Sequence, residues 1–140
     1  MKIAQEIGDR SSEGVAYGSF GGTYHLRGDY RKAIEYYENG LKITQQIGDR
    51  SREGETYGNL GSTYFSLGYY RKAIEYHKKC LKIAHEIGDR SGQGRAYENL
   101  GLTYHSLSEY GKAIEHCEKG LKIAQEIGDR SVEGLSLIHI

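Results

Sequence analysis

The chain has 140 residues, with 19 basic and 19 acidic side chains and therefore a formal net charge of zero. A balanced charge lacks the basic footprint of nucleic-acid binders and gives no long-range attraction to anionic membranes, so we expect neither partner. The apolar runs are too short to span a bilayer, and the first residues lack a signal-peptide pattern, so no membrane insertion is expected. Two cysteines without metal-ligand spacing favour a reduced, cytoplasmic setting.

Two short motifs recur along the chain with one period. Ile-Gly-Asp-Arg-Ser occurs at residues 7–11, 47–51, 87–91 and 127–131, and Lys-Ala-Ile-Glu occurs at 32–35, 72–75 and 112–115, always 40 residues apart. A fixed period of this size indicates a stack of like units rather than one central core. The predicted array covers residues 1–134, with a partial unit 1–8, units 9–48, 49–88 and 89–128, and a partial unit 129–134.

Each unit is predicted to contain two helices separated by glycine turns. Around the second unit, Gly48, Gly68 and Gly88 each follow an apolar-periodic run, which is the usual place for a left-handed residue at a helix end. Asp49 and Asp89 come next and are expected to cap the helices that follow.

Apolar periodicity predicts how the two helices of a unit pack. In the first helix, Tyr57, Leu60, Gly61 and Tyr64 are spaced as one helix face. Gly61 lies in the middle of that helix, at a cost of about 1 kcal/mol relative to alanine. We therefore expect the second helix to approach closely at this point, with Ala73 facing Gly61. The predicted fold class is all-α, an α-solenoid of antiparallel helix pairs.

The pattern Tyr57-x2-Leu60-Gly61-x2-Tyr64, followed by Ala73, resembles the consensus of the tetratricopeptide repeat. The same positions hold Tyr17, Phe20, Gly21, Tyr24 and Ala33 in the first unit, and Tyr97, Leu100, Gly101, Tyr104 and Ala113 in the third. The chain departs from the consensus in its longer period, in the absence of proline, and in having Tyr37, His77 and Cys117 where the consensus has phenylalanine. The long period is similar to that of Partner-of-Inscuteable/LGN spindle-orientation scaffolds, of large animal tetratricopeptide scaffolds and of bacterial signalling proteins, which the sequence does not separate.

The last residues, 135–140, match no other part of the repeat. They resemble the in-frame translation of a sequencing adapter, so we interpret the chain as a fragment from a truncated gene. A natural apolar capping tail is the alternative interpretation. Neither end of the array carries the polar cap that repeat proteins need for solubility, so the ends would permit self-association.

A helical wheel places a second set of first-helix residues opposite the Tyr-Leu-Gly-Tyr stripe, where they would line the concave face of the superhelix. The predicted groove residues are Glu55, Asn59, Ser62 and Phe65 in the second unit, and Arg95, Glu98, Asn99, Leu102 and His105 in the third.

The family resemblance implies that these first-helix residues hold an extended or helical peptide. It also implies that Asn59 and Asn99 match an asparagine that binds the ligand backbone, because an amide both donates and accepts. The alternative is that each asparagine bonds its neighbour in the stack. Arg95 would either hold a ligand carboxylate in a bidentate contact or pair with Glu55.

Other chemistry-bearing residues form no recognisable site. The six histidines make no metal-binding pair at helical spacing, and Cys80 and Cys117 occupy small core positions. The chain has no phosphate-binding glycine motif and no nucleophile elbow. We therefore expect no catalytic residue, no metal and no cofactor.

The sequence leaves two candidate functions. The first is a protein–protein interaction module, part of a scaffold or adaptor in signalling, that binds a peptide segment in the concave groove. The alternative is the regulatory sensor segment of a larger bacterial-type signalling ATPase or protease. An enzyme in its own right is not expected.

Overall fold

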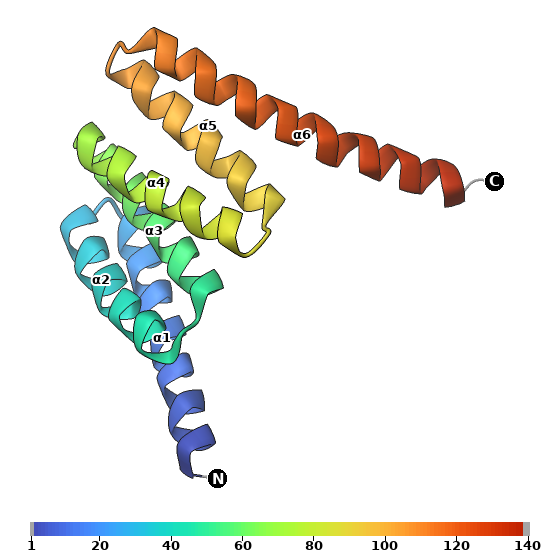
Figure 1. Cartoon of the computed structure of the whole chain (residues 1–140). Helices are drawn as coiled ribbons and strands as arrows, with labels where there is room; N and C mark the ends of the chain where they lie inside the picture. The colour runs from blue at the N-terminus through green and yellow to red at the C-terminus, as the bar shows by residue number, and fades with distance from the viewer. Residues whose placement is uncertain (1, 139–140) are drawn as a thin grey trace.

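The computed structural model describes the backbone of residues 2–138 and the side chains of residues 5–128 and 130. Within that range the chain forms six α-helices and no strand. The helices are α1 (Lys2–Leu26), α2 (Tyr30–Ile47), α3 (Arg50–Ser66), α4 (Tyr70–Glu86), α5 (Arg90–Ser106) and α6 (Tyr110–Ile138). Figure 1 shows them as three antiparallel pairs stacked in chain order. The predicted all-α solenoid of helix pairs is confirmed.

Glycine turns end the helices at the predicted positions. Gly48, Gly68 and Gly88 have left-handed φ angles of 72°, 82° and 72°. The caps are also as predicted: Asp49 Oδ1 accepts a hydrogen bond from the Arg52 amide at 3.1 Å, and Asp89 Oδ1 accepts one from the Gly92 amide at 2.9 Å. At residues 47–51 and 87–91 the Ile-Gly-Asp-Arg-Ser segment therefore ends one helix and starts the next.

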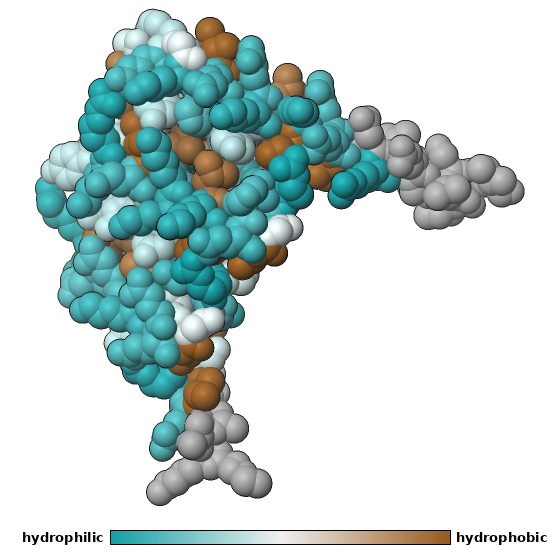
Figure 2. Space-filling view, viewed as in Figure 1, coloured by the Kyte–Doolittle hydropathy of each residue, from teal (hydrophilic) through white to brown (hydrophobic). Residues whose placement is uncertain are grey.

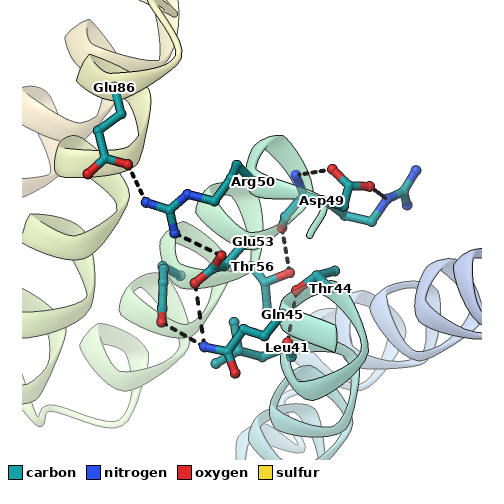
Figure 3. A network of polar contacts seen from close by, with 10 residues as sticks. Leu41, Thr44, Gln45, Asp49, Arg50, Glu53, Thr56 and Glu86 are labelled. Atoms are coloured by element: carbon teal, nitrogen blue, oxygen red, sulfur yellow. Dashed lines mark hydrogen bonds and ion pairs between the residues drawn. The ribbon is translucent and has the colours of Figure 1, made fainter. Parts of the chain in front are cut away.

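The arginine of that segment ties the two helices of a pair together. Arg50 reaches from the start of α3 to Glu86 at the end of α4, as Figure 3 shows, while its other terminal nitrogen contacts Glu53 at 2.9 Å. Arg90 makes the equivalent contact with Glu126, and Arg10 with Gln46. These charged groups are about half exposed, so the ion pairs align the two helices more than they add to the free energy of unfolding.

The close approach predicted at Gly61 is present, although its partner differs from the prediction. A Cβ atom on Gly61 would lie 2.7 Å from the ring of His77, and one on Gly21 would lie 2.6 Å from the ring of Tyr37. The atoms nearest Gly61 thus belong to the residue one turn after Ala73, because that longer side chain on the same helix face lies over the glycine.

The buried core lies inside each helix pair and also continues from one pair to the next. Leu60 and Leu100 are both fully buried. Leu60 belongs to a buried cluster with Ala33 and Tyr37 of the preceding pair, and Leu100 to one with Ile74, Tyr104 and Ala113. Each unit therefore completes the core of the unit before it, as expected for a repeat array.

The two ends of the chain differ from the prediction of separate half pairs. The same pentapeptide that makes a turn at Gly48 and Gly88 stays helical at Gly8 and Gly128, so α1 and α6 run on without a break. Both helices project beyond the stack in Figure 1. A turn is stabilised by the helix that packs back after it, and neither end has a complete neighbouring helix within this chain.

Candidate functional site

A hollow of about 360 Å³ lies between the second and third helix pairs. Its polar lining comes from the first helices of the two pairs. Among the predicted groove residues, those that line it are Glu55, Asn59 and Ser62 of α3, and Arg95 and Asn99 of α5. The structure therefore brings five of the nine predicted residues together around one cavity.

A second hollow of about 470 Å³ continues this surface toward the N-terminus. It is lined by Ser19, Gly22, Thr23, His25 and Leu26 of α1, together with Tyr37. Asn59 and Ser62 line both hollows. The two hollows therefore adjoin at α3 and form one groove along α1, α3 and α5, which we call the inner groove.

The remaining predicted residues lie elsewhere. Glu98, Leu102 and His105 line a separate, mostly apolar cavity of about 570 Å³ between α5 and α6, at the C-terminal end of the stack. Phe65 packs on Tyr70, with ring centroids 5.2 Å apart. These four side chains therefore do not line the inner groove.

Two side chains of the inner groove, those of Asn59 and Asn99, have no hydrogen-bond partner in the described part of the chain. Asn59 and Asn99 accept hydrogen bonds through their backbone carbonyls, from Thr63 and Thr103 respectively, but neither side-chain amide is bonded. The alternative in which each asparagine bonds a stack neighbour is thus not observed. Both amides keep their full capacity to donate and accept.

Two charged side chains at the groove, Glu55 and Arg95, are also available to a ligand. Both Glu55 and Arg95 are exposed and line the same hollow, yet no ion pair joins them among the described side chains. A cation and an anion thus stand separately over one cavity, and each can meet a group of opposite charge on a ligand.

The floor of the groove comes from α4 and the residue that follows it, which sequence reasoning did not include. Cys80, Ile83 and Ala84 of α4 and the following Ile87 all line the 360 Å³ hollow. They reach it because α3 has small residues at two successive turns: a Cβ on Gly54 would lie 2.8 Å from Ile83, and one on Gly58 would lie 3.3 Å from the Cys80 sulfur. The pair of glycines one turn apart in the sequence was the available signal.

The groove shows no sign of activated chemistry. Burial raises the pKa of the Cys80 thiol, which disfavours the nucleophilic thiolate at neutral pH. No group of three or more potential metal-ligating side chains occurs within the described residues.

None of the helices described is both long and apolar enough to cross a bilayer.

Comparisons with known proteins place this geometry in a family. A family model described as tetratricopeptide repeat matches residues 52–126, and a second with the same description matches residues 16–51. The first match covers more than half of the chain, so the chain belongs to the tetratricopeptide repeat family. Arrays of this family are protein–protein interaction modules. The particular long-period type that the sequence resembles stays a prediction.

Several solved structures share the fold. The TPR domain of Arabidopsis FLU aligns with a TM-score of 0.80 at 24% identity, over 84% of this chain and 98% of that one. Aspartyl phosphate phosphatase F from Bacillus subtilis aligns with a TM-score of 0.82 at 18% identity, over 85% of this chain and 31% of that one. A signal transduction ATPase with numerous domains and a tetratricopeptide repeat sensor, from Pyrococcus horikoshii, aligns with a TM-score of 0.80 at 27% identity, over 92% of this chain and 20% of that one. No curated protein sequence matches the chain.

Proposed function

We propose that the inner groove binds an extended peptide segment of a protein partner. The observation that carries this proposal is the pair of unbonded amides, Asn59 and Asn99, which stand on successive first helices over one cavity. An amide can pair with the N–H and the C=O of a peptide unit without reading its sequence. Two such amides at successive repeats suit a ligand that runs along the stack.

The other lining residues add selectivity. Ile83, Ala84 and Ile87 offer an apolar floor for one or two ligand side chains. Arg95 and Glu55 stand on opposite helices and favour a ligand that carries both an acidic and a basic group. In this role the chain binds and positions a partner in the cytoplasm and carries out no reaction of its own.

The experiment selects peptides from a displayed random library against the chain and measures their affinity by calorimetry. We expect Asn59→Ala with Asn99→Ala to weaken binding roughly tenfold to a hundredfold, because each lost hydrogen bond is worth about 0.5–1.5 kcal/mol. Both side chains lie outside the core, so the helical content should not change. The matched control is Lys78→Ala with Lys79→Ala on the exposed side of α4, which should bind like the original chain.

Two results would contradict this proposal. If the double asparagine variant loses its fold, as Gly61→Leu should through its clash with His77, the asparagines are structural. If it stays folded and binds normally while the lysine control is impaired, the ligand uses the convex face instead.

The alternative function is a sensor segment that regulates an enzyme domain of a larger signalling ATPase or protease. The similarity to the tetratricopeptide repeat sensor of the Pyrococcus horikoshii protein, over most of this chain, favours the ATPase version. Its test is the genomic sequence on either side of this coding region. A nucleotide-binding domain in the same reading frame supports the sensor role, and further repeats or other non-enzymatic segments alone support the scaffold.

A further inference from the structure

The two ends of the stack expose residues that are buried at the equivalent positions inside it. On α6, Ile114 is 59% exposed, whereas its counterpart Ile74 is 6% exposed. On α1, Phe20 is 52% exposed, whereas Leu60 at the equivalent position is fully buried. Figure 2 shows apolar side chains emerging between hydrophilic ones along α6. Each end thus presents one half of an interface whose other half exists at the opposite end.

We define the two halves by their residues. The C-terminal face consists of Leu102 and His105 of α5 with Ile114, Cys117, Leu121 and Gln125 of α6. The N-terminal face consists of Glu13, Ala16, Tyr17, Phe20 and Thr23 of α1. In the middle of the stack, the equivalents of the first face contact the equivalents of the second.

The junction between the first and second pairs shows which polar contacts these positions make. The side-chain amide of Gln45 on α2 lies 3.4 Å from the Glu53 carboxylate and 3.2 Å from the Tyr57 hydroxyl, both on α3; Gln45 and Glu53 are labelled in Figure 3. His25 Nδ1 on α1 lies 2.9 Å from Thr63 Oγ1 on α3.

The end faces carry the same five residue types at the same positions of the 40-residue repeat. Gln125 and His105 on the C-terminal face correspond to Gln45 and His25, while Glu13, Tyr17 and Thr23 on the N-terminal face correspond to Glu53, Tyr57 and Thr63. His105 already has the orientation of its counterpart, since each histidine meets the edge of a tyrosine five residues later, with ring centroids 5.7 Å apart for His105 and 5.2 Å for His25.

This agreement is not a general property of the repeat. At the second junction, Phe65 replaces the histidine, His85 replaces the glutamine and Gln93 replaces the glutamate. Neither the histidine–threonine contact nor the glutamine contacts can form there. The first and third units share a histidine and a glutamine at these positions, which the second unit lacks. In this chain no helix pair follows the third unit, so His105 and Gln125 have no junction in which to make these contacts.

The apolar parts of the two faces also match in size. The N-terminal face has the larger Phe20 where the inner units have leucine, and the C-terminal face has the smaller Cys117 where the first unit has Tyr37. The short cysteine side chain leaves open the cavity of about 570 Å³ between α5 and α6, which Ala113, Ile114 and Leu121 help to line. A phenylalanine ring entering from a neighbouring molecule would occupy part of that space, against Ala113 and Cys117.

We propose that the C-terminal face of one chain binds the N-terminal face of a second copy, head to tail, and that this contact repeats the junction between the first and second pairs. The occupant of the apolar cavity is Phe20 of the second copy. Because the two faces are different surfaces, each dimer keeps one free face of each kind, and the contact leads to open chains of molecules rather than a closed dimer. The proposal does not depend on what the inner groove binds.

The test uses two variants of the full chain that each block one face, Phe20→Glu and Ile114→Glu. Sedimentation velocity in reducing buffer, which rules out disulfides through the exposed Cys117, should show that the original chain associates progressively over about a hundredfold range of concentration. Each variant alone should remain a monomer, because a carboxylate buried in an apolar contact is strongly unfavourable. An equimolar mixture should form a one-to-one dimer that grows no further, because each variant supplies the face that the other lacks.

The control variant is Lys78→Glu, which adds a carboxylate on the exposed side of α4 and should associate like the original chain. If circular dichroism shows that either blocking variant loses helicity, the exposed Thr23→Arg and Cys117→Arg replace Phe20→Glu and Ile114→Glu. The proposal is wrong if the original chain stays monomeric at all concentrations. That result would mean that these faces serve only to join further repeats of one polypeptide. It is also wrong if either blocked variant still self-associates, which indicates a symmetric contact, or if the mixture remains monomeric.

Discussion

His77 occupies the position beside Gly61 that Tyr37 and Cys117 occupy in the other two units. It is 2% exposed, and its Nδ1 atom is buried without a hydrogen-bond partner in the described structure. A buried imidazole without a partner strongly prefers its neutral form. Burial accordingly lowers the pKa of His77 from 6.5 to about 4. This residue therefore makes the free energy of unfolding depend on pH.

The predicted consequence is a loss of stability in mild acid. The unfolded chain takes up a proton near pH 6.5, whereas the folded chain does so only near pH 4, so the contribution of His77 is fully present above pH 6.5 and is lost as the pH falls toward 4. The full loss is about 3 kcal/mol at 1.36 kcal/mol per pKa unit. Urea unfolding between pH 7.5 and pH 4 measures it.

The matched control for this prediction is His77→Tyr. Tyrosine already fits beside the corresponding glycine in the first unit, where the Tyr37 ring lies over Gly21. This variant should keep the fold and lose that part of the pH dependence. If the free energy of unfolding depends on pH equally in the original chain and in His77→Tyr, then His77 is protonated normally and water reaches it in the folded chain.

At the scale of the helix, one pentapeptide gives two structures. Ile-Gly-Asp-Arg-Ser forms a turn with a left-handed glycine at Gly48 and Gly88, and continues a helix at Gly8 and Gly128. The local residues are the same, so the difference comes from the neighbours. The turn is favoured where the next helix can bury its apolar face against the previous pair. Sequence reasoning predicted the turns and caps correctly for this reason, and failed at the ends, where no complete neighbouring helix lies within the chain.

An alanine substitution should therefore have opposite effects in the two contexts. Gly88→Ala should lower the free energy of unfolding by about 1 kcal/mol or more, because the left-handed conformation is strained for any residue with a Cβ. Gly128→Ala should leave it unchanged or raise it by up to about 1 kcal/mol, because alanine is the better helix former. No atom lies within 4 Å of the added Cβ at either site, so a steric clash does not confuse the comparison. Thermal unfolding of both variants measures the difference. If Gly128→Ala loses as much stability as Gly88→Ala, a turn also forms at the C-terminal site.

At the scale of the whole molecule, the period predicted the stack, the pairing of helices and five of the residues over the inner groove. These features follow from helical periodicity and from repetition, both of which are visible in one sequence. The contribution of α4 to the groove floor was missed because it depends on how deeply Ile83 reaches past Gly54, which is a matter of packing. Leu102 and His105 were assigned to the groove because a helical wheel does not say where the stack ends.

The tail, residues 135–140, provides the last test at this scale. Sequence reasoning separates it from the array, and its side chains lie outside the described part of the structure. The position of α5 gives a physical reason for the same expectation. α5 begins at Arg90, whose side chain contacts Glu126, so Glu126 is level with the end of the partner helix. Residue 135 lies nine residues further on, about 13 Å along the axis of α6 at the rise of an α-helix. At that distance α6 has passed the end of α5.

We therefore expect that deletion of residues 135–140 leaves the stability of the stack unchanged. We expect the melting temperature of the 1–134 chain to stay within about 2 °C of that of the full chain, since about 1 kcal/mol corresponds to a shift of several degrees in a domain of this size. Differential scanning calorimetry at low protein concentration, where association between copies is minimal, makes the comparison. A larger fall would show that the tail packs on the array as a natural cap, and would overturn its interpretation as a segment foreign to the repeat.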